Sequence, residues 1–269
     1  TATPGARAQS AAVETAPKPS LIDQWARSVE YAVLLKQNGW PGWTYTSTGT
    51  HPEIEWVETF DKPSSEYRQQ CETSYSLGWT AVEAAAKSQT GELAVVLDLD
   101  ETVLVNLKFQ QENADRPFDP NTWNAWVQRK EAGAVPGAKE FLDKVRSLGG
   151  RVHLVYMSDR ASSQDAFTIE NMRRLGLFAE GDIVLSKTGK TDTKEVRRQC
   201  VMTGKNGTDT RCKTYEPMVI IAKFGDSLRD HFEIYGRDAA MKSLDDPRWA
   251  TEDFVLPNPM YGQWARDYK

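Results

Sequence analysis

The sequence predicts an α/β fold in which a doubly wound, mainly parallel sheet carries helices on both faces. Three short apolar runs, at residues 94–99, 152–157 and 218–224, have the composition of strands that are buried on both sides. Segments with the helical spacing of apolar residues separate these runs, so strands and helices alternate along the chain. Polar side chains stand at the end of each run, which is where open α/β sheets bind their ligands.

The first ninety residues are expected to form a leader and then helices. Residues 1–19 are rich in Ala, Pro, Ser and Thr and do not begin with Met, which indicates a flexible tether left by a removed signal peptide or by trimming. One helix is expected from 20 to about 38, then a loop over 40–63 with a short turn of helix, then a long helix from 64 or 65 towards 87. Residues 20–90 together are expected to pack on the core as an N-terminal helical segment.

Residues 91–269 are expected to form the core, with a small, mostly helical cap inserted at about 106–134. The remaining elements follow from apolar periodicity and from Gly and Pro at their ends. We expect strands at 94–99, 152–157, 183–185, 218–224 and 254–256. Between them we expect helices at 137–148, 163–175, 193 onwards and 227–236.

Composition and charge exclude several classes of protein. The chain has 269 residues, of which 39% are hydrophobic and 26% charged, as in an ordinary globular protein. It carries 33 basic and 38 acidic side chains, a net charge of −5, without a basic block, which argues against polymeric nucleic acid as a partner. No apolar stretch approaches the roughly 20 residues that span a bilayer, so we expect a soluble protein without a transmembrane segment.

None of the three cysteines has the paired spacing of a zinc site. Cys71 falls on the apolar face of the expected long helix, which predicts a core position. Cys200 and Cys212 flank a polar segment with the composition of a surface loop. We expect a disulfide between them in an oxidising compartment, with two free thiols as the alternative.

The strand at 94–97 leads into Asp98, Asp100, Glu101 and Thr102, which form the pattern DxDET. Two carboxylates held two residues apart repel each other and are costly to desolvate without a cation or a proton between them. Mg²⁺ is a hard divalent cation that suits such oxygen ligands. Acids that favour a helix dipole are the alternative. The complete pattern after an apolar strand favours catalysis.

The pattern DxDET resembles the first motif of the haloacid dehalogenase superfamily of aspartate-nucleophile phosphatases. Later strand ends and helix starts supply further polar groups in the order found in that superfamily, namely Ser158, Lys194, and Asp226 with Asp230. Each match is weak alone, but the ordered set in its strand context is specific. The resemblance implies phosphate monoesters as small-molecule substrates and Mg²⁺ as the cofactor.

By this resemblance, Asp98 attacks phosphorus and becomes an aspartyl-phosphate. Asp100 protonates the leaving oxygen and then activates water, which also predicts an acid pH optimum. The expected ligands of Mg²⁺ are the Asp98 carboxylate, the Asp100 backbone carbonyl and Asp226.

The same resemblance gives supporting roles to three further residues. Ser158 is expected to hydrogen-bond a phosphoryl oxygen, and Lys194 to offset the charge of nucleophile and phosphate. Lys187 and Lys190 lie just upstream and are the alternatives to Lys194. Asp230 is expected to orient Asp226 or a metal-bound water, with a helix N-terminal acid as its alternative interpretation.

A closer resemblance extends from about residue 20 to 264. It is to the class C acid phosphatases, bacterial cell-surface lipoproteins that include 5′-nucleotidases. Six segments carry it: SSEYRQQ, VVLDLDETVL, RPFDPNTWNAWV, GAVPGAKEFL, KFGDSLRDHF and LPNPMYGQW.

This family resemblance implies that aromatic side chains beside the site stack on a nucleoside. Trp123 and Tyr261 stand at the matching positions, and Trp264 is a lesser candidate; core packing is the alternative for each. We also expect substrate contacts from Arg160 and Asn106. Nucleoside 5′-monophosphates are therefore expected among the substrates.

The resemblance further implies a bacterial protein that is periplasmic, anchored to the outer membrane or secreted. A lipid anchor upstream of Thr1 and a homodimer are part of this expectation. Residues 40–63 and the loop at 200–212 look like additions, and Val105 stands where related sequences often have an acid, so substrate range is less certain than reaction type.

Three other functions remain open from the sequence. DxDET also resembles phosphoprotein phosphatases of the same superfamily. A catalytically silent surface binding or storage protein is a second alternative, against which the retained motif residues argue. Phosphomutase or phosphotransferase activity, which capture of the phosphoryl group by an added alcohol would reveal, is the third.

Overall fold

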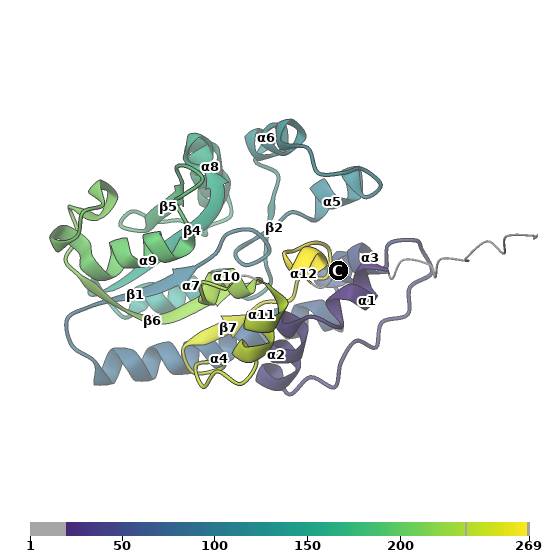
Figure 1. Cartoon of the computed structure of the whole chain (residues 1–269), viewed down its shortest axis with the longest axis horizontal. Coiled ribbons are helices and arrows are strands. Elements are labelled where there is room, and N and C mark those ends of the chain that lie inside the picture. Colours follow the sequence, from purple (N-terminus) through teal and green to yellow (C-terminus); the bar gives the residue numbers. More distant parts are fainter. Residues whose placement is uncertain (1–19, 235, 268–269) are drawn as a thin grey trace, which may run out of the picture.

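The computed structural model describes residues 20–234 and 236–267, so the predicted leader at 1–19 lies outside the described residues. Within the described part, five parallel strands form one sheet in the order β5-β4-β1-β6-β7 (Figure 1). The strands are β1 (Glu92–Leu97), β4 (Val152–Ala161), β5 (Ile183–Lys187), β6 (Met218–Gly225) and β7 (Asp253–Val255). The predicted α/β fold with a mainly parallel sheet is confirmed.

Helices connect these strands and also precede them. The described helices are α1 (Leu21–Trp25), α2 (Val29–Asn38), α3 (Pro52–Glu58), α4 (Glu66–Ser88), α5 (Leu107–Asn113), α6 (Pro120–Arg129), α7 (Ala138–Ser147), α8 (Asp165–Arg174), α9 (Lys194–Thr203), α10 (Leu228–His231), α11 (Arg237–Ser243) and α12 (Trp264–Asp267).

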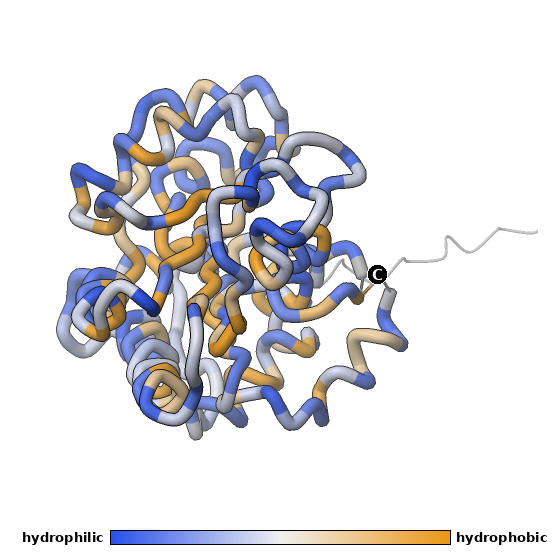
Figure 2. The backbone as a smooth tube through the Cα atoms, turned by 90° about the vertical axis from the view of Figure 1, so that its left-hand side faces the viewer, coloured by the Kyte–Doolittle hydropathy of each residue, from blue (hydrophilic) through white to orange (hydrophobic). Residues whose placement is uncertain are grey.

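The central strand β1 shows that both faces of the sheet are covered. Leu93, Val95 and Leu97 pack in the large core with residues of α4 and α7. The alternate residues Ala94 and Val96 pack in a second core with residues of α9. Successive side chains of a strand point to opposite faces, so a strand buried on both faces is apolar throughout, as the sequence of β1 is. Figure 2 shows the hydrophobic segments gathered towards the middle of the molecule.

Helix α4 runs along one face of the sheet beneath β6 and β7 (Figure 1). It approaches closely because residue 78 is a glycine, and a Cβ at this position would overlap the ring of Phe224. The Phe224 ring is stacked between Tyr75 of α4 and Phe254 of β7, with centroid distances of 5.6 and 5.0 Å. These contacts fix the depth of the helix against the strand that ends at the site.

A small helical unit rises from the carboxyl side of the sheet (Figure 1). The chain leaves through β2 (Leu104–Val105), forms α5 and α6, and returns through β3 (Gly133–Ala134), which pairs antiparallel with β2. This unit occupies the segment for which a cap was predicted, although the domain boundaries themselves stay predictions.

The single helix predicted from residue 20 to about 38 is wrong in its middle. Helix α1 ends at Trp25, and Ser28 starts α2 as an N-cap whose side chain accepts a hydrogen bond from the backbone N of Tyr31. A serine in an extended conformation at a cap competes with helix continuation. The break brings Trp25 onto Tyr31, at a centroid distance of 4.7 Å, in an aromatic cluster with Trp40 and Trp56.

The helix predicted from 227 to about 236 is also shorter than expected. Helix α10 ends at His231, and Phe232 has an extended backbone. The last carbonyl group, that of His231, accepts a hydrogen bond from the Lys223 ammonium at 2.8 Å and so has a partner outside the helix.

The two predictions about the cysteines are confirmed. Cys200 and Cys212 form a disulfide, and Cys71 is buried as a free thiol. Among the described residues, none of the helices has both the length and the apolar character needed to cross a bilayer.

Candidate active site

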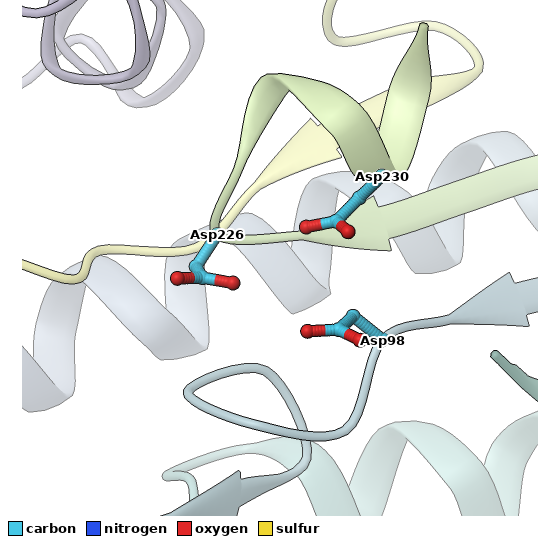
Figure 3. A group of neighbouring side chains, drawn as sticks. All are labelled: Asp98, Asp226 and Asp230. Carbon is cyan, nitrogen blue, oxygen red and sulfur yellow. The ribbon is translucent and has the colours of Figure 1, made fainter. Parts of the chain in front are cut away.

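Two neighbouring strands end at carboxylates. The strand ends of β1 and β6 are joined by a hydrogen bond from Asp98 N to Phe224 O at 2.9 Å, which places Asp98 beside Asp226. Asp230 comes from the first turn after β6. Oxygen atoms of these three buried carboxylates lie within 4.8 Å of one another, and Figure 3 shows them gathered at the ends of the two strands.

Backbone and amide donors hold two of these carboxylates in place. Asn258, from the segment after β7, donates to Asp226 Oδ2 at 2.7 Å. The backbone N of Ser227 donates to Asp230 Oδ2 at 2.9 Å within a capping box. These donors fix the orientation of both carboxylates.

Lys194 supplies the opposite charge. It is the first residue of α9, and its ammonium contacts Asp98 Oδ1 at 2.5 Å and also pairs with Asp230 Oδ1. Burial lowers the pKa of Lys194, but the carboxylates of Asp230 and Asp98 outweigh burial and raise it above its usual value. The ammonium is thus held in its charged form between the two acids.

Three carboxylates against one ammonium leave an excess of negative charge in a buried site. Burial raises the pKa of Asp98, Lys194 lowers it in part, and Asp230 raises it again. Burial likewise raises the pKa of Asp226 well above its usual range, and the charges of Asp230 and Asp98 add to this. Buried carboxylates with raised pKa values are relieved by a proton or a cation, so the donor set fits a hard divalent ion.

Asp100 faces the same region but pairs with different residues. Its Oδ1 accepts from Arg160 Nη2 at 2.7 Å and from the side-chain amide of Asn106 at 2.8 Å. Asn106 is fully buried, and its Oδ1 accepts from the indole of Trp126 at 2.9 Å. Arg160 is also buried and donates to Thr168 at 3.1 Å. Asn106 therefore links Asp100 to the cap, and Arg160 links Asp100 to α8.

Ser158 lies in β4, next to β1. It is fully buried, and its hydroxyl accepts from the backbone N of Arg160 at 3.1 Å. Its carbonyl accepts from Arg197 Nη1 at 2.5 Å, and Arg197 comes from α9, three residues after Lys194. One buried guanidinium therefore ties the end of β4 to the first turn of α9.

Glu101 joins the loop after β1 to the C-terminal segment. Its Oε1 accepts from the backbone N of Asn106 at 3.0 Å and from the Tyr261 hydroxyl at 2.8 Å. Its backbone has φ of 56°, a left-handed conformation that costs energy for a residue with a side chain. Burial raises the pKa of Glu101 to about 7, against the lowering effect of the hydrogen bonds from Asn106 and Tyr261.

Comparison with known proteins decides the family. The model of the haloacid dehalogenase superfamily, subfamily IIIB (acid phosphatase), matches residues 31–264. The chain belongs to this acid phosphatase family.

Similar structures agree with this assignment. A structure of the class C acid phosphatase from Bacillus anthracis is 28% identical, covers 88% of this chain and 91% of its own, and has a TM-score of 0.66. A crystal structure of class C acid phosphatase from the same organism with tungstate bound is also 28% identical, covers 81% of this chain and 90% of its own, and has a TM-score of 0.63.

This chain is also similar, at lower sequence identity, to a plant protein. The Stem 31 kDa glycoprotein of Glycine max is 23% identical over 170 residues, which are 62% of this chain. The match spans 58% of the length of that relative.

Of the three aromatic residues to which the resemblance to class C acid phosphatases points, two are partly buried and one is fully buried. Trp123, in α6, is partly buried, packs edge-on against Phe109 at 5.2 Å and lies under the Arg160 guanidinium at 5.4 Å. Tyr261 is tied to Glu101 as described above. Trp264 is buried in the core, so its ring is not available to a ligand.

Sequence reasoning on the acid phosphatase motifs named the residues that the structure brings together, but it missed part of their support. The sequence gives Glu101 only as part of the DxDET pattern and does not predict its contacts with Asn106 and Tyr261. Arg197 and Asn258 carried no signal, because a helical arginine and a loop asparagine are common. Only spatial contact identifies them.

Proposed function

We propose that this protein is a Mg²⁺-dependent acid phosphatase that hydrolyses phosphate monoesters through an aspartyl-phosphate on Asp98. The observation that carries the proposal is the position of Asp98. It lies at the end of the central strand, 2.5 Å from the Lys194 ammonium and within 4.8 Å of the Asp226 carboxylate. A nucleophilic carboxylate can approach a phosphate dianion only where nearby cations cancel the repulsion.

Asp98 and Asp226 would hold Mg²⁺ through their carboxylates and Asp100 through its backbone carbonyl, with Asp230 in support. The raised pKa values of Asp98 and Asp226 support this assignment, because they reflect negative charge that lacks a full counter-charge. When bound, the ion supplies positive charge against the phosphoryl oxygens and the nucleophile.

The first chemical step forms a bond between an Asp98 oxygen and phosphorus and breaks the bond from phosphorus to the ester oxygen. Asp100 gives its proton to the departing oxygen, which leaves as an alcohol. In the second step water attacks phosphorus, Asp100 takes the proton of that water, and Asp98 is released with inorganic phosphate. Arg160 and Asn106 orient the Asp100 carboxylate for both transfers, since they donate to it at 2.7 and 2.8 Å.

Ser158 and Lys194 act on the phosphoryl group itself. The Ser158 hydroxyl donates to a phosphoryl oxygen, and the Arg160 backbone N that donates to this hydroxyl fixes its lone pairs and so its orientation. Lys194 offsets the charge shared by Asp98 and the phosphate. Lys187 pairs with Asp159 at 3.6 Å instead, which favours Lys194 for this role.

Nucleoside 5′-monophosphates are the substrate class that we propose within this activity. Trp123, in the cap helix α6, lies against the Arg160 guanidinium that pairs with Asp100, and Tyr261, after β7, donates to the neighbouring Glu101. A base between two aromatic faces gains stacking energy of about 0.5–1.5 kcal/mol per pair beyond burial.

The test measures phosphate release from 5′-nucleotides and from an aryl phosphate, with Mg²⁺ or with a chelator. Asp98→Asn removes the nucleophile. Asp182→Asn is the control, because Asp182 lies directly before β5, at the opposite end of the strands. Turnover that needs Mg²⁺, disappears in Asp98→Asn and survives in Asp182→Asn supports the proposal. Tungstate, a tetrahedral oxyanion bound in the Bacillus anthracis structure, is expected to inhibit competitively. Metal-loaded wild type without turnover of either substrate would instead favour a silent binding protein.

The proposal includes a cellular location and an oligomeric state. The disulfide favours an oxidising compartment such as the periplasm or the exterior of a bacterium. A lipid anchor and a homodimer rest on the resemblance alone. Cell fractionation and light scattering in solution would test them.

A further inference from the structure

The position of Lys194 depends on the loop that precedes it. Lys194 is the first residue of α9, and residues 188–193 connect it to the end of β5. The side chain reaches Asp98 and Asp230 from this helix start, so a shift of the first turn of α9 moves the ammonium away from both acids.

Asp192 organises this loop from its inside. It is buried, with 6% of its surface exposed, and its Oδ2 accepts from both the backbone N and the hydroxyl of Thr188 at 2.9 Å. Its own backbone N donates to Gly189 O at 3.3 Å. The carboxylate thus closes the loop on itself directly before the capping residue Thr193.

Arg211 holds Asp192 from outside the loop. Its guanidinium donates to both carboxylate oxygens of Asp192, at 2.8 and 3.0 Å, in the paired geometry that makes such contacts strong. The same guanidinium also donates to both carboxylate oxygens of Asp209, from Nη2 at 2.6 Å and from Nε at 3.0 Å. Burial raises the pKa of Asp192, but the hydrogen bonds from Arg211 and Thr188 lower it to about 2, so the pair is charged at neutral pH.

The Cys200–Cys212 disulfide places Arg211 there. Cys200 belongs to α9 itself, and Cys212 follows Arg211 in the turn Thr210–Cys212. Both sulfur-bearing residues are buried in the core on the α9 face of the sheet. The disulfide therefore ties the turn that carries Arg211 to the same helix that carries Lys194.

We infer that Arg211 is a positioning residue for Lys194, and that the Cys200–Cys212 disulfide acts on the reaction through Arg211. The guanidinium fixes Asp192, Asp192 fixes the loop before α9, and the loop fixes the helix start from which Lys194 reaches Asp98. The inference rests on the proposed function only in giving Lys194 a part in phosphate chemistry.

A double-mutant cycle on catalysis tests this inference. Arg211→Ala and the pair Cys200→Ser with Cys212→Ser are each expected to lower kcat about 10- to 100-fold, the cost of a misplacement of about 1 Å, with KM changing less than about threefold. All three substitutions together are expected to cost no more than the larger of the two effects, because both act through one contact. Arg211→Lys, which keeps the charge without the fork, is expected to recover part of kcat.

Arg146→Ala is the matched control. Arg146 also pairs with a buried aspartate, Asp182, at 2.7 Å, and both arginine side chains are 24% exposed. It joins α7 to the segment before β5, away from Lys194, so kcat is expected to stay at the wild-type value. Equal losses of kcat in Arg146→Ala and Arg211→Ala, or effects of Arg211 and the cysteines that multiply, would overturn the inference.

Amide hydrogen exchange gives a second measurement that does not depend on turnover. Peptides covering residues 186–198 are expected to exchange faster in Arg211→Ala and in the cysteine variant than in wild type or Arg146→Ala. Unchanged exchange there would overturn the inference even in an active enzyme. If wild type shows no turnover, the proposed function fails, and this measurement still decides the inference. Should Arg211→Ala not fold, Asp192→Asn removes the charge and one of the two accepting oxygens from the contact with Arg211, with little change of volume.

Discussion

Replacement of Glu101 by Gln should make the protein more stable at alkaline pH. Glu101 is buried, with 1% of its surface exposed, and its Oε1 accepts hydrogen bonds from Asn106 and Tyr261. Its Oε2 has no hydrogen-bond partner among the residues that the structure describes. A glutamine keeps the accepting oxygen and removes the charge, so Glu101→Gln imitates the protonated acid.

The magnitude follows from the raised pKa. The side chain ionises near pH 4.5 in the unfolded chain and near pH 7 in the folded protein, because burial disfavours its charge. The folded state therefore keeps its full stability below pH 4.5 and loses it as the pH rises to 7, by about 1.4 kcal/mol per pH unit. The total loss is about 3 kcal/mol. At pH 5 the variant should be more stable than wild type by less than about 1 kcal/mol, and at pH 8 by up to about 3 kcal/mol.

Denaturant unfolding at pH 5 and pH 8 measures this difference, with a chelator present so that no metal binds the neighbouring carboxylates. In thermal unfolding the same difference corresponds to about 6–12 °C for a chain of this size. Tyr261→Phe is the companion variant. It removes a hydrogen bond that lowers the pKa of Glu101, so its loss of stability between pH 5 and 8 should exceed that of wild type. Parallel pH dependences of wild type and Glu101→Gln would refute the reasoning.

Three further outcomes are expected. Gly78→Ala should lower the free energy of unfolding by about 1–3 kcal/mol, measured in denaturant, since its Cβ overlaps the buried Phe224 ring and the surrounding core has to shift. Mg²⁺ should raise the melting temperature more at pH 8 than at pH 5, because protons compete for the buried carboxylates whose pKa values are raised; an equal effect at both pH values would contradict this. Arg160→Lys should lower kcat more than it raises KM for any phosphate ester, since a single ammonium cannot reproduce the paired contact with Asp100.

The fold and the acidic centre could be predicted because they follow from local pattern. An apolar strand that leads into DxDET places Asp98 at the carboxyl end of that strand. A second strand that leads into Asp226 brings this residue to the same end of the sheet if the two strands are parallel neighbours, as they are here. The preference for Lys194 over Lys187 and Lys190 also agrees with the contacts, because among the described residues it is the Lys194 ammonium, at the start of α9, that contacts Asp98.

The support of the site could not be predicted because it depends on distant contacts. Asn258 reaches Asp226 across 32 positions, and Tyr261 reaches Glu101 across 160. The break between α1 and α2 could not be predicted for a different reason. Ser28 satisfies the criteria for an N-cap, but an unbroken helix also fits the apolar spacing, and only the packing of Trp25 on Tyr31 decides between them.

Stability and function oppose each other at this acidic centre. The same burial that raises the pKa values of Asp98 and Asp226 makes the metal-free protein less stable as the pH rises, since the unfolded chain ionises first. Replacing the acids by neutral residues would remove that cost and also the reason for a cation to bind. The fold instead stabilises the centre with groups that do not react: the Asn258 amide, the Ser227 backbone N, and the Arg211–Asp192 pair behind Lys194. Substitutions in this supporting set should therefore reduce activity without removing any reacting group, whereas neutral substitutions of the acids themselves should raise metal-free stability and abolish turnover.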